Sequence, residues 1–329
     1  MTNNFCVICL GEILFDCLAD QIGRSQSKVE SWTSYPGGAP ANVACALAKL
    51  GSSAAFIGAV GQDDAGKELV KVLESVGVDT TGVQYHSTAP TRQVYVLRSE
   101  SGDRTFAGFG DKSPSEFADA FLDASKLPVE LFEAADFLVL GTLELAYPKT
   151  RKAVFRALEL AEQHNVKTVL DVNWRPRFWE DPNDALPYIN KLWEHIDFLK
   201  LSDDEAQWLF KTTDAGAIAN RLETVEGVLV TAGEKQISYY LSESEGKIAP
   251  FPVKVQDTTG AGDGFVAGLI HQLCQHKISS LKQPEIAKQV VTYATAVGSL
   301  VTTKPGAIAA QPTAAEVDEF LKNQLSKSS

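Results

Sequence analysis

The nine residues from Asp257 to Phe265 are the part of this 329-residue chain best suited to chemistry. They read D-T-T-G-A-G-D-G-F, so three glycines and one alanine fall within five residues. Such small residues let successive backbone N–H groups point toward one centre. A helical pattern, Phe265–Leu273, follows, and a helix N-terminus attracts anions. The pattern predicts an anion hole for a phosphoryl group, formed by Gly260, Ala261 and Gly262.

Asp263 stands at the edge of this predicted anion hole. A carboxylate there can accept the proton of a hydroxyl group as its oxygen attacks phosphorus, so we expect Asp263 to be a general base. The alternative is a glycine-rich turn whose aspartate caps a helix. A strand pattern, Val253–Val255, precedes the stretch, and we expect a strand-to-helix turn.

Other motifs point to no different chemistry. Residues 61–68 read G-Q-D-D-A-G-K-E, which has the glycine and lysine spacing of a P-loop. Glu68, however, occupies the position where a hydroxyl must reach magnesium, so we reject a P-loop. The five histidines show no metal-ligand spacing.

Charge and cysteine content exclude several classes of partner. The net charge is -12, which disfavours binding to nucleic acid or to an anionic membrane. The sequence has no apolar run of about 18 residues, and its first residues do not resemble a signal peptide. The five cysteines are scattered, and Cys6 and Cys9 would face opposite sides of a strand. We expect free thiols and a cytoplasmic location.

Short strand patterns alternate with helical patterns along most of the chain. This order predicts an α/β fold with a mainly parallel, doubly wound sheet and helices on both faces, whose ligands bind beyond the carboxyl ends of the strands. The expected strands are Cys6–Leu10, Ala54–Val60, Phe137–Leu140, Thr168–Asp171, Phe198–Leu201 and Val228–Thr231. The expected helices include Pro40–Leu50, Gly66–Val76, Lys149–His164 and Asp203–Lys211.

Two segments, 17–35 and 92–110, interrupt the alternation with short strand-like pieces. Taken alone, they are either two long surface loops or a small separate sheet. The length of the chain fits either two domains or one large α/β domain with an added element.

Several motifs give the chain a resemblance to a known family. The stretch 257–265 resembles the C-terminal signature of the ribokinase or PfkB-type carbohydrate kinases. Residues 37–44, G-G-A-P-A-N-V-A, resemble the N-terminal sugar-binding signature of that family. Residues 171–176, 200–205 and 306–313 are similar to motifs of its fructokinase branch. The resemblance implies one ribokinase-like domain over 1–329, with segments 17–35 and 92–110 forming a β-lid.

The resemblance also implies an ATP-dependent kinase that transfers phosphate to the primary hydroxyl of fructose. Sugar contacts fall on Asp16, Gly37, Gly38, Asn42 and Arg175. Nucleotide contacts fall on Asn173, Ser202, Thr231, Gly233, Gly260, Gly262 and Thr295. Glu205 would position Mg²⁺ through water, although Ser202-x-x-Glu205 alone would be read as a helix capping box. A potassium site would take Asp257, Thr259, Val301, Lys304, Gly306 and Ala310.

One departure from the fructokinase pattern concerns the sugar. Many fructokinases carry an arginine in the motif F-Y-R-N-P-S-A-D, where this chain reads F-A-G-F-G-D-K-S-P-S over residues 106–115. Fructose recognition would therefore use Gln93, Arg104 or Glu144, or else the sugar differs. A ribokinase or nucleoside kinase of the same fold, and a non-catalytic binding protein, are the alternatives. A homodimer formed through the lid is a further expectation.

Overall fold

The computed structural model describes residues 6–99 and 104–328. Residues 1–5, on which the signal-peptide prediction rests, and 100–103, within the predicted lid, lie outside the described residues. The strands of the main sheet are β1 (Cys6–Leu10), β4 (Ser53–Gly61), β5 (Asp79–His86), β8 (Phe137–Leu140), β9 (Lys167–Asp171), β10 (Phe198–Ser202), β11 (Gly227–Thr231), β12 (Ile237–Leu241) and β13 (Ser244–Ile248).

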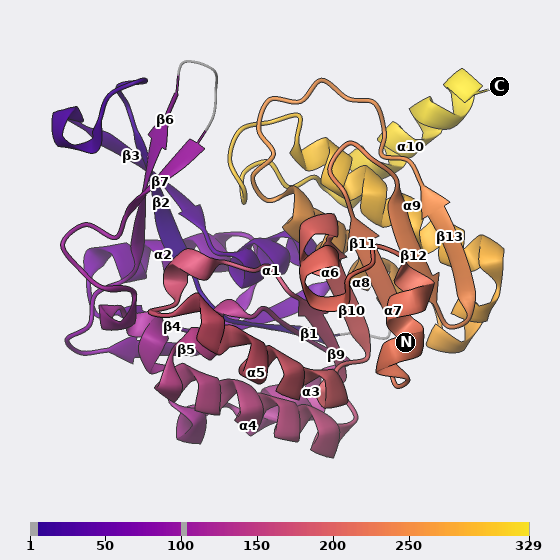
Figure 1. Ribbon diagram of the computed structural model, residues 1–329, viewed down its shortest axis with the longest axis horizontal. Helices are drawn as coiled ribbons and strands as arrows, with labels where there is room; N and C mark the ends of the chain where they lie inside the picture. Colours follow the sequence, from indigo (N-terminus) through magenta and orange to yellow (C-terminus); the bar gives the residue numbers. More distant parts are fainter. Residues whose placement is uncertain (1–5, 100–103, 329) are drawn as a thin grey trace.

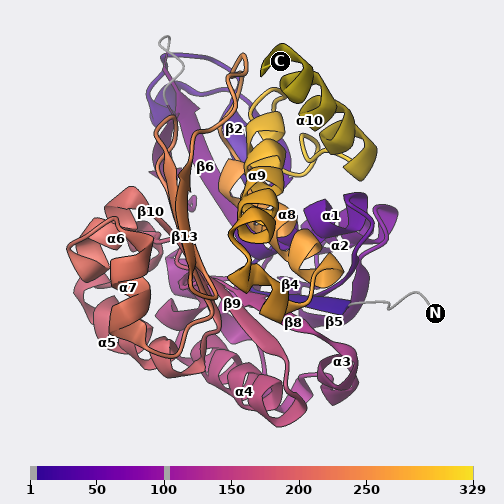
Figure 2. The same cartoon turned by 90° about the vertical axis from the view of Figure 1, so that its right-hand side faces the viewer.

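The helices lie in two layers, one on each face of the main sheet (Figure 2). One layer consists of α1 (Ala39–Lys49), α2 (Asp64–Ser75), α8 (Ala261–Gln275), α9 (Pro284–Val301) and α10 (Ala314–Ser328). The other consists of α3 (Val129–Ala134), α4 (Pro148–His164), α5 (Ala185–Ile189), α6 (Asp203–Phe210) and α7 (Ala215–Leu222).

The alternation of side chains along each strand builds both cores. In β1, Val7 and Cys9 pack into the core of the first helix layer, whereas Ile8 and Leu10 pack into the second. All four residues are fully buried, as expected for a strand inside a sheet that is covered on both faces. The described cysteines are free thiols.

The strand order of the main sheet is β13-β12-β11-β10-β9-β8-β1-β4-β5. All neighbours from β11 to β5 pair in parallel, and β12 and β13 extend the sheet as antiparallel strands. The predicted doubly wound α/β fold is therefore confirmed. The chain moves outward from β1 in one direction to β4 and β5, and in the other direction from β8 onward. This reversal marks the place where such sheets bind ligands.

The two segments that interrupt the alternation form a separate small sheet (Figure 1). Its strands are β2 (Leu14–Ala19), β3 (Trp32–Gly37), β6 (Gln93–Arg98) and β7 (Arg104–Gly108), in the order β3-β2-β6-β7. Strand β2 pairs in parallel with β6 although the two are far apart in the sequence. The segments are thus not simple surface loops.

A buried arginine lies where the small sheet meets the rest of the molecule. Arg92 directly precedes β6 and is 1% exposed. Its Nε and Nη2 donate hydrogen bonds of 2.5 and 2.8 Å to Asp119. Its guanidinium group also lies over the rings of Phe109, Phe117, Tyr147 and Phe178. Removing either partner of such a deeply buried ion pair would destabilise the fold, because the other charge would stay buried without compensation.

One strand prediction is wrong. Residues 253–255 have no strand pairing in the described structure. They follow Phe251, whose ring lies 5.2 Å from that of Phe320 on α10. Phe251 thus packs on a helix, whereas Val255 of the predicted strand is 49% exposed and buries little apolar surface. No helix in the described ranges is long and apolar enough to cross a membrane.

Candidate active site

A cleft of about 510 Å³ opens at the carboxyl ends of β1, β9 and β10. The small sheet forms one wall, through Asp16, Val94 and Phe106, and the first turn of α8 forms another. Predicted site residues that line the cleft are Asp16, Gly38, Asn42, Asn173, Arg175, Ser202, Glu205, Thr259, Gly260, Gly262 and Asp263. A more open groove of about 630 Å³ runs beside α4 and contains none of these residues.

The start of α8 has the form expected of an anion hole. Gly260 caps the helix with a φ of +79°, a backbone conformation that other residues rarely adopt. The helix begins at Ala261, four residues before the helical pattern of the sequence. Gly262 and Asp263 therefore belong to the first turn, whose N–H groups have no partner within the helix. These N–H groups, with the helix dipole, favour a phosphoryl group in this end of the cleft.

Asp263 is held in place by Asn42, which comes from α1. The Nδ2 of Asn42 donates a hydrogen bond of 2.7 Å to Oδ2 of Asp263. Burial raises the pKa of Asp263 above its ordinary value, while the hydrogen bond from Asn42 and the charge of Lys200 oppose the shift. The Oδ1 of Asn42 is buried and has no hydrogen-bond partner among the described residues. A ligand hydroxyl that donates to this oxygen would satisfy it.

Two buried glutamates brace the turn that leads into α1. The Oε1 of Glu12 accepts a hydrogen bond of 2.8 Å from the N–H of Ala39, and Oε1 of Glu144 accepts one of 3.0 Å from the N–H of Glu12. Burial and the charge of Glu144 raise the pKa of Glu12 well above its ordinary value. Gly38 has a φ of +105°, and a Cβ there would lie 2.5 Å from the carbonyl oxygen of Glu12. Only glycine fits this close approach.

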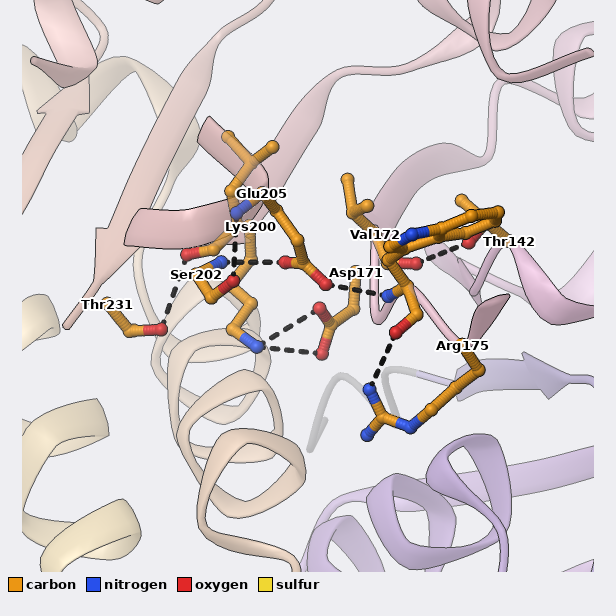
Figure 3. Close-up of polar contacts among 10 residues, drawn as sticks. Thr142, Asp171, Val172, Arg175, Lys200, Ser202, Glu205 and Thr231 are labelled. Carbon is orange, nitrogen blue, oxygen red and sulfur yellow. Dashed lines mark hydrogen bonds and ion pairs between the residues drawn. The ribbon is translucent and has the colours of Figure 1, made fainter. Parts of the chain in front are cut away.

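Glu205 and Ser202 form the capping box of α6 (Figure 3). The Oε2 of Glu205 accepts a hydrogen bond of 2.7 Å from the N–H of Ser202, and its Oε1 accepts one of 2.6 Å from the N–H of Trp174. No group of three or more acidic, histidine or cysteine residues in the described chain is arranged to hold a metal ion.

Lys200, which lines the cleft, forms a buried ion pair with Asp171 (Figure 3). Nζ of Lys200, on β10, is 3.1 Å from each carboxylate oxygen of Asp171, the last residue of β9. Burial raises the pKa of Asp171 to about 6 although Lys200 opposes the shift. Burial alone would lower the pKa of Lys200, but Asp171 and Glu205 outweigh it and the pKa is raised. The ion pair thus favours the charged form of each group against the effect of burial.

The residues predicted to bind nucleotide lie partly away from the cleft. Thr231 ends β11, where its hydroxyl donates a hydrogen bond of 3.3 Å to the carbonyl of Leu201. Gly233 occupies the following turn with a φ of +58°. Thr295 is buried within α9, and its hydroxyl donates to the carbonyl of Val291 at 2.7 Å. In this conformation Thr295 serves helix packing.

The predicted cation residues come from the last residue of α9 and from two loops that meet beside α8. Oδ1 of Asp257 accepts hydrogen bonds from the N–H and hydroxyl of Thr259, at 3.0 and 2.7 Å. Oδ2 of Asp257 accepts one of 3.0 Å from the N–H of Gly306. Val301 ends α9, and Ala310 is buried. The side chain of Lys304 instead forms an ion pair of 3.0 Å with Glu316.

The proposed substitutes for the missing arginine differ in position. Gln93 accepts a hydrogen bond of 3.1 Å from the hydroxyl of Tyr95 and does not line the cleft. Arg104 begins β7, opposite Arg98. Glu144 does not line the cleft, and its buried Oε2 has no hydrogen-bond partner among the described residues.

Sequence reasoning gave no role to several residues that line the cleft. They are Glu12, Leu14, Ala39, Val94, Phe106, Leu143, Phe178, Lys200 and Thr258. The sequence did contain a signal for Lys200, which is a lysine within an otherwise apolar strand. A lysine is rarely buried there unless it has a charged partner. Glu12 left a similar signal, an acidic residue directly after a buried strand.

Comparison with known proteins agrees with this geometry. The pfkB family carbohydrate kinase profile matches residues 5–314. "Probable fructokinase-2" of Arabidopsis thaliana is 35% identical over 326 residues, which cover 98% of each protein. A fructokinase from Xylella fastidiosa, solved with bound ATP, superposes with a TM-score of 0.87 at 28% identity and covers 97% of this chain and 98% of its own.

A second solved structure holds fructose and ADP. It is the fructokinase of Vibrio cholerae in its fructose-, ADP- and calcium-bound form, with a TM-score of 0.81 and 28% identity over 97% of this chain and 99% of its own. The full-length matches, together with the helix N-terminus and the carboxylate in one cleft, lead to one conclusion. This chain belongs to the pfkB family of carbohydrate kinases.

Proposed function

We propose that the protein transfers the γ-phosphate of ATP to the 6-hydroxyl of fructose, which yields fructose 6-phosphate and ADP. The observation that carries the proposal is the placement of Asp263, fixed by Asn42 at 2.7 Å, beside the first-turn N–H groups of α8. Support for fructose comes from the relatives of this chain, several of which are named fructokinases.

In the proposed reaction, the acceptor oxygen of the sugar bonds to the γ-phosphorus. The bond between that phosphorus and the β,γ-bridging oxygen breaks, and ADP leaves. The proton of the hydroxyl passes to Oδ1 or Oδ2 of Asp263. The N–H group of Gly262 would stabilise the charge that develops on the phosphoryl oxygens. The N–H group of Ala261 would join it by giving up its 3.3 Å hydrogen bond to the carbonyl of Thr258.

Recognition of a neutral sugar would rest on fixed polar groups and an aromatic wall. Asp16 and the unpartnered Oδ1 of Asn42 can each accept a bond from a sugar hydroxyl. Phe106 and Phe178 line the same cleft and can pack against the C–H face of the ring. Exposed Arg175 is within the lining, but no arginine stands at the usual fructokinase position. An acidic sugar is therefore disfavoured.

The proposed cofactors are Mg²⁺ and K⁺. Mg²⁺, when bound to ATP, would neutralise phosphate charge, and Glu205 would orient its waters. K⁺ would bind the carbonyl groups of the two loops joined by Asp257 and Gly306. Since one of these loops ends at Gly260, the ion would brace the start of α8.

We further propose that the small sheet acts as a lid over the sugar and as a contact between two copies of the chain. Its inner residues already line the cleft, so a small closing movement would exclude water that competes as phosphoryl acceptor. Strands β3 and β7 are its edges, and edge strands can pair with another chain. Sedimentation of the protein would reveal such a dimer.

The free thiols fit a reducing compartment such as the cytoplasm.

The test is a coupled ADP-release assay with fructose, glucose, ribose, ketodeoxygluconate and adenosine. We expect the highest kcat/KM with fructose. A higher value with ribose or adenosine would reject fructose and leave a kinase for another acceptor. No turnover with any acceptor would support the remaining alternative, a binding protein without kinase activity.

A further inference from the structure

Lys200 combines two properties that an ordinary structural ion pair does not need. It is 7% exposed, and the cleft is lined by its side chain together with Gly260, Gly262 and Asp263. Its Nζ lies 3.1 Å from the point that a Cβ on Gly262 would occupy. The ammonium group therefore sits directly against the first turn of α8, where the phosphoryl group is expected.

The donors of Lys200 are not exhausted by its ion pair. The described hydrogen bonds of Nζ go to the two carboxylate oxygens of Asp171, both at the rather long distance of 3.1 Å. An ammonium group has three N–H donors, so a third donor remains for a group in the cleft. Asp171, one strand away, holds the ammonium group in this position (Figure 3).

The charge balance of the cleft points the same way. Its lining includes the carboxyl groups of Asp16, Glu205 and Asp263. The lining cations among the described residues are Lys200 and Arg175, and only Lys200 is buried. A nucleoside triphosphate brings further negative charge into this acidic cleft, so a buried cation next to the anion hole has a clear electrostatic use.

We propose that Lys200 is a catalytic residue that donates a hydrogen bond to an oxygen of the phosphoryl group during transfer. As the acceptor oxygen bonds to phosphorus and the bond to the β,γ-bridging oxygen breaks, Lys200 stabilises the charge on the transferred group while Asp263 takes the hydroxyl proton. The inference rests on the proposed phosphoryl transfer but does not depend on which sugar is the acceptor.

The competing explanation is that Lys200 only neutralises Asp171 and so stabilises the sheet. Three variants separate the two roles. Lys200→Met removes the ammonium group and leaves Asp171 unpaired. The double variant Lys200→Met/Asp171→Leu removes both charges, which proteins commonly tolerate without loss of stability. Asp171→Asn breaks the ion pair but keeps the ammonium group.

The chain provides a matched control. Lys167 on β9 also forms close ion pairs, at 2.6 Å to Asp197 and to Glu226, but it lies at the opposite, amino-terminal end of the strand, away from the cleft. Lys167→Met tests the general effect of losing a paired lysine from the sheet. It should keep wild-type kcat at a temperature where the variant is folded.

The expected results are specific to a catalytic cation. Both variants that lack Lys200 should lose about 10²- to 10³-fold in kcat, the usual effect of removing one such donor, whereas Asp171→Asn should retain more than about a tenth. The affinity for a mimic of the transition state should fall in the same two variants. ADP, magnesium and tetrafluoroaluminate, bound together with the sugar, imitate the phosphoryl group during transfer. The variants should bind this combination about 10²-fold more weakly or worse, whereas their affinity for ADP alone should change by less than about threefold.

A kcat of the folded double variant within about tenfold of wild type would overturn the inference. Equal weakening of ADP and of the tetrafluoroaluminate complex would also overturn it, because Lys200 would then serve ground-state binding or structure. If wild-type protein transfers phosphate to none of the acceptors, this inference and the proposed function fail together. If the wild type is active and the variants are unimpaired, only this inference fails.

Discussion

Replacement of Asp263 by asparagine tests the proposed mechanism most directly. The substitution keeps the size of the side chain, and its Oδ1 can still accept the hydrogen bond that Asn42 donates at 2.7 Å. The fold and the first turn of α8 should therefore be preserved. What is lost is the acceptor for the proton of the sugar hydroxyl, whose pKa lies far above 7.

The expected magnitude follows from that loss. General-base catalysis contributes typically 10²- to 10⁴-fold, which corresponds to about 2.7 to 5.4 kcal/mol of the activation free energy. We expect kcat of Asp263→Asn to fall within this range. ATP affinity should change by less than about threefold, because the substitution removes an interaction with the acceptor and not with the nucleotide.

The assay is coupled ADP release at saturating fructose and ATP, with ATP affinity measured by calorimetry. Asp64→Asn is the matched control, because Asp64 also lies in the first turn of a helix but is exposed and outside the cleft. A kcat of Asp263→Asn above about a tenth of wild type would refute the reasoning.

The pH profile of the wild type adds a second test of the same residue. Asp263 must be ionised to accept a proton, and its pKa is raised by burial. kcat/KM should therefore decline as the pH falls through this raised pKa, and the decline should begin at a higher pH than for an exposed aspartate. Asp263→Asn should lack that acid limb, and persistence of the limb would assign it to another group.

The remaining predictions concern the metal sites, the lid and the buried arginine. Glu205→Gln should raise the magnesium concentration needed for half-maximal rate, and an unchanged requirement would remove Glu205 from magnesium positioning. Potassium should raise the rate over a bulky organic cation at equal ionic strength, and equal rates would exclude the proposed site. Hydrogen exchange should slow in β2, β3 and β6 when sugar is added, and unchanged exchange would mean that the small sheet does not close. Asp119→Ala leaves Arg92 buried without its partner, so the free energy of unfolding measured in urea should fall by about 3–5 kcal/mol. A fall below about 1 kcal/mol would show that the surrounding aromatic rings alone compensate the charge of Arg92.

Contiguous patterns in the sequence predicted much of this protein correctly. β1 and β8 have the predicted bounds, because an unbroken apolar run suits a central strand that is buried on both faces. The glycines around residue 260 likewise predicted a turn before a helix, since backbone freedom at a capping glycine is a local property, although the helix begins at Ala261 and not at Phe265. The pattern at 253–255 failed because a strand needs a pairing partner, which local sequence does not reveal.

Contacts between distant residues were decided by the tertiary structure. Asn42 and Asp263 are 221 positions apart, and Lys200 and Asp171 are 29 apart. These pairs meet because two helices of one layer begin at the edge of the sheet toward which two adjacent parallel strands run. Strand order, and not composition or spacing, brings such side chains together, so the buried cation beside the anion hole could be assigned only from the fold.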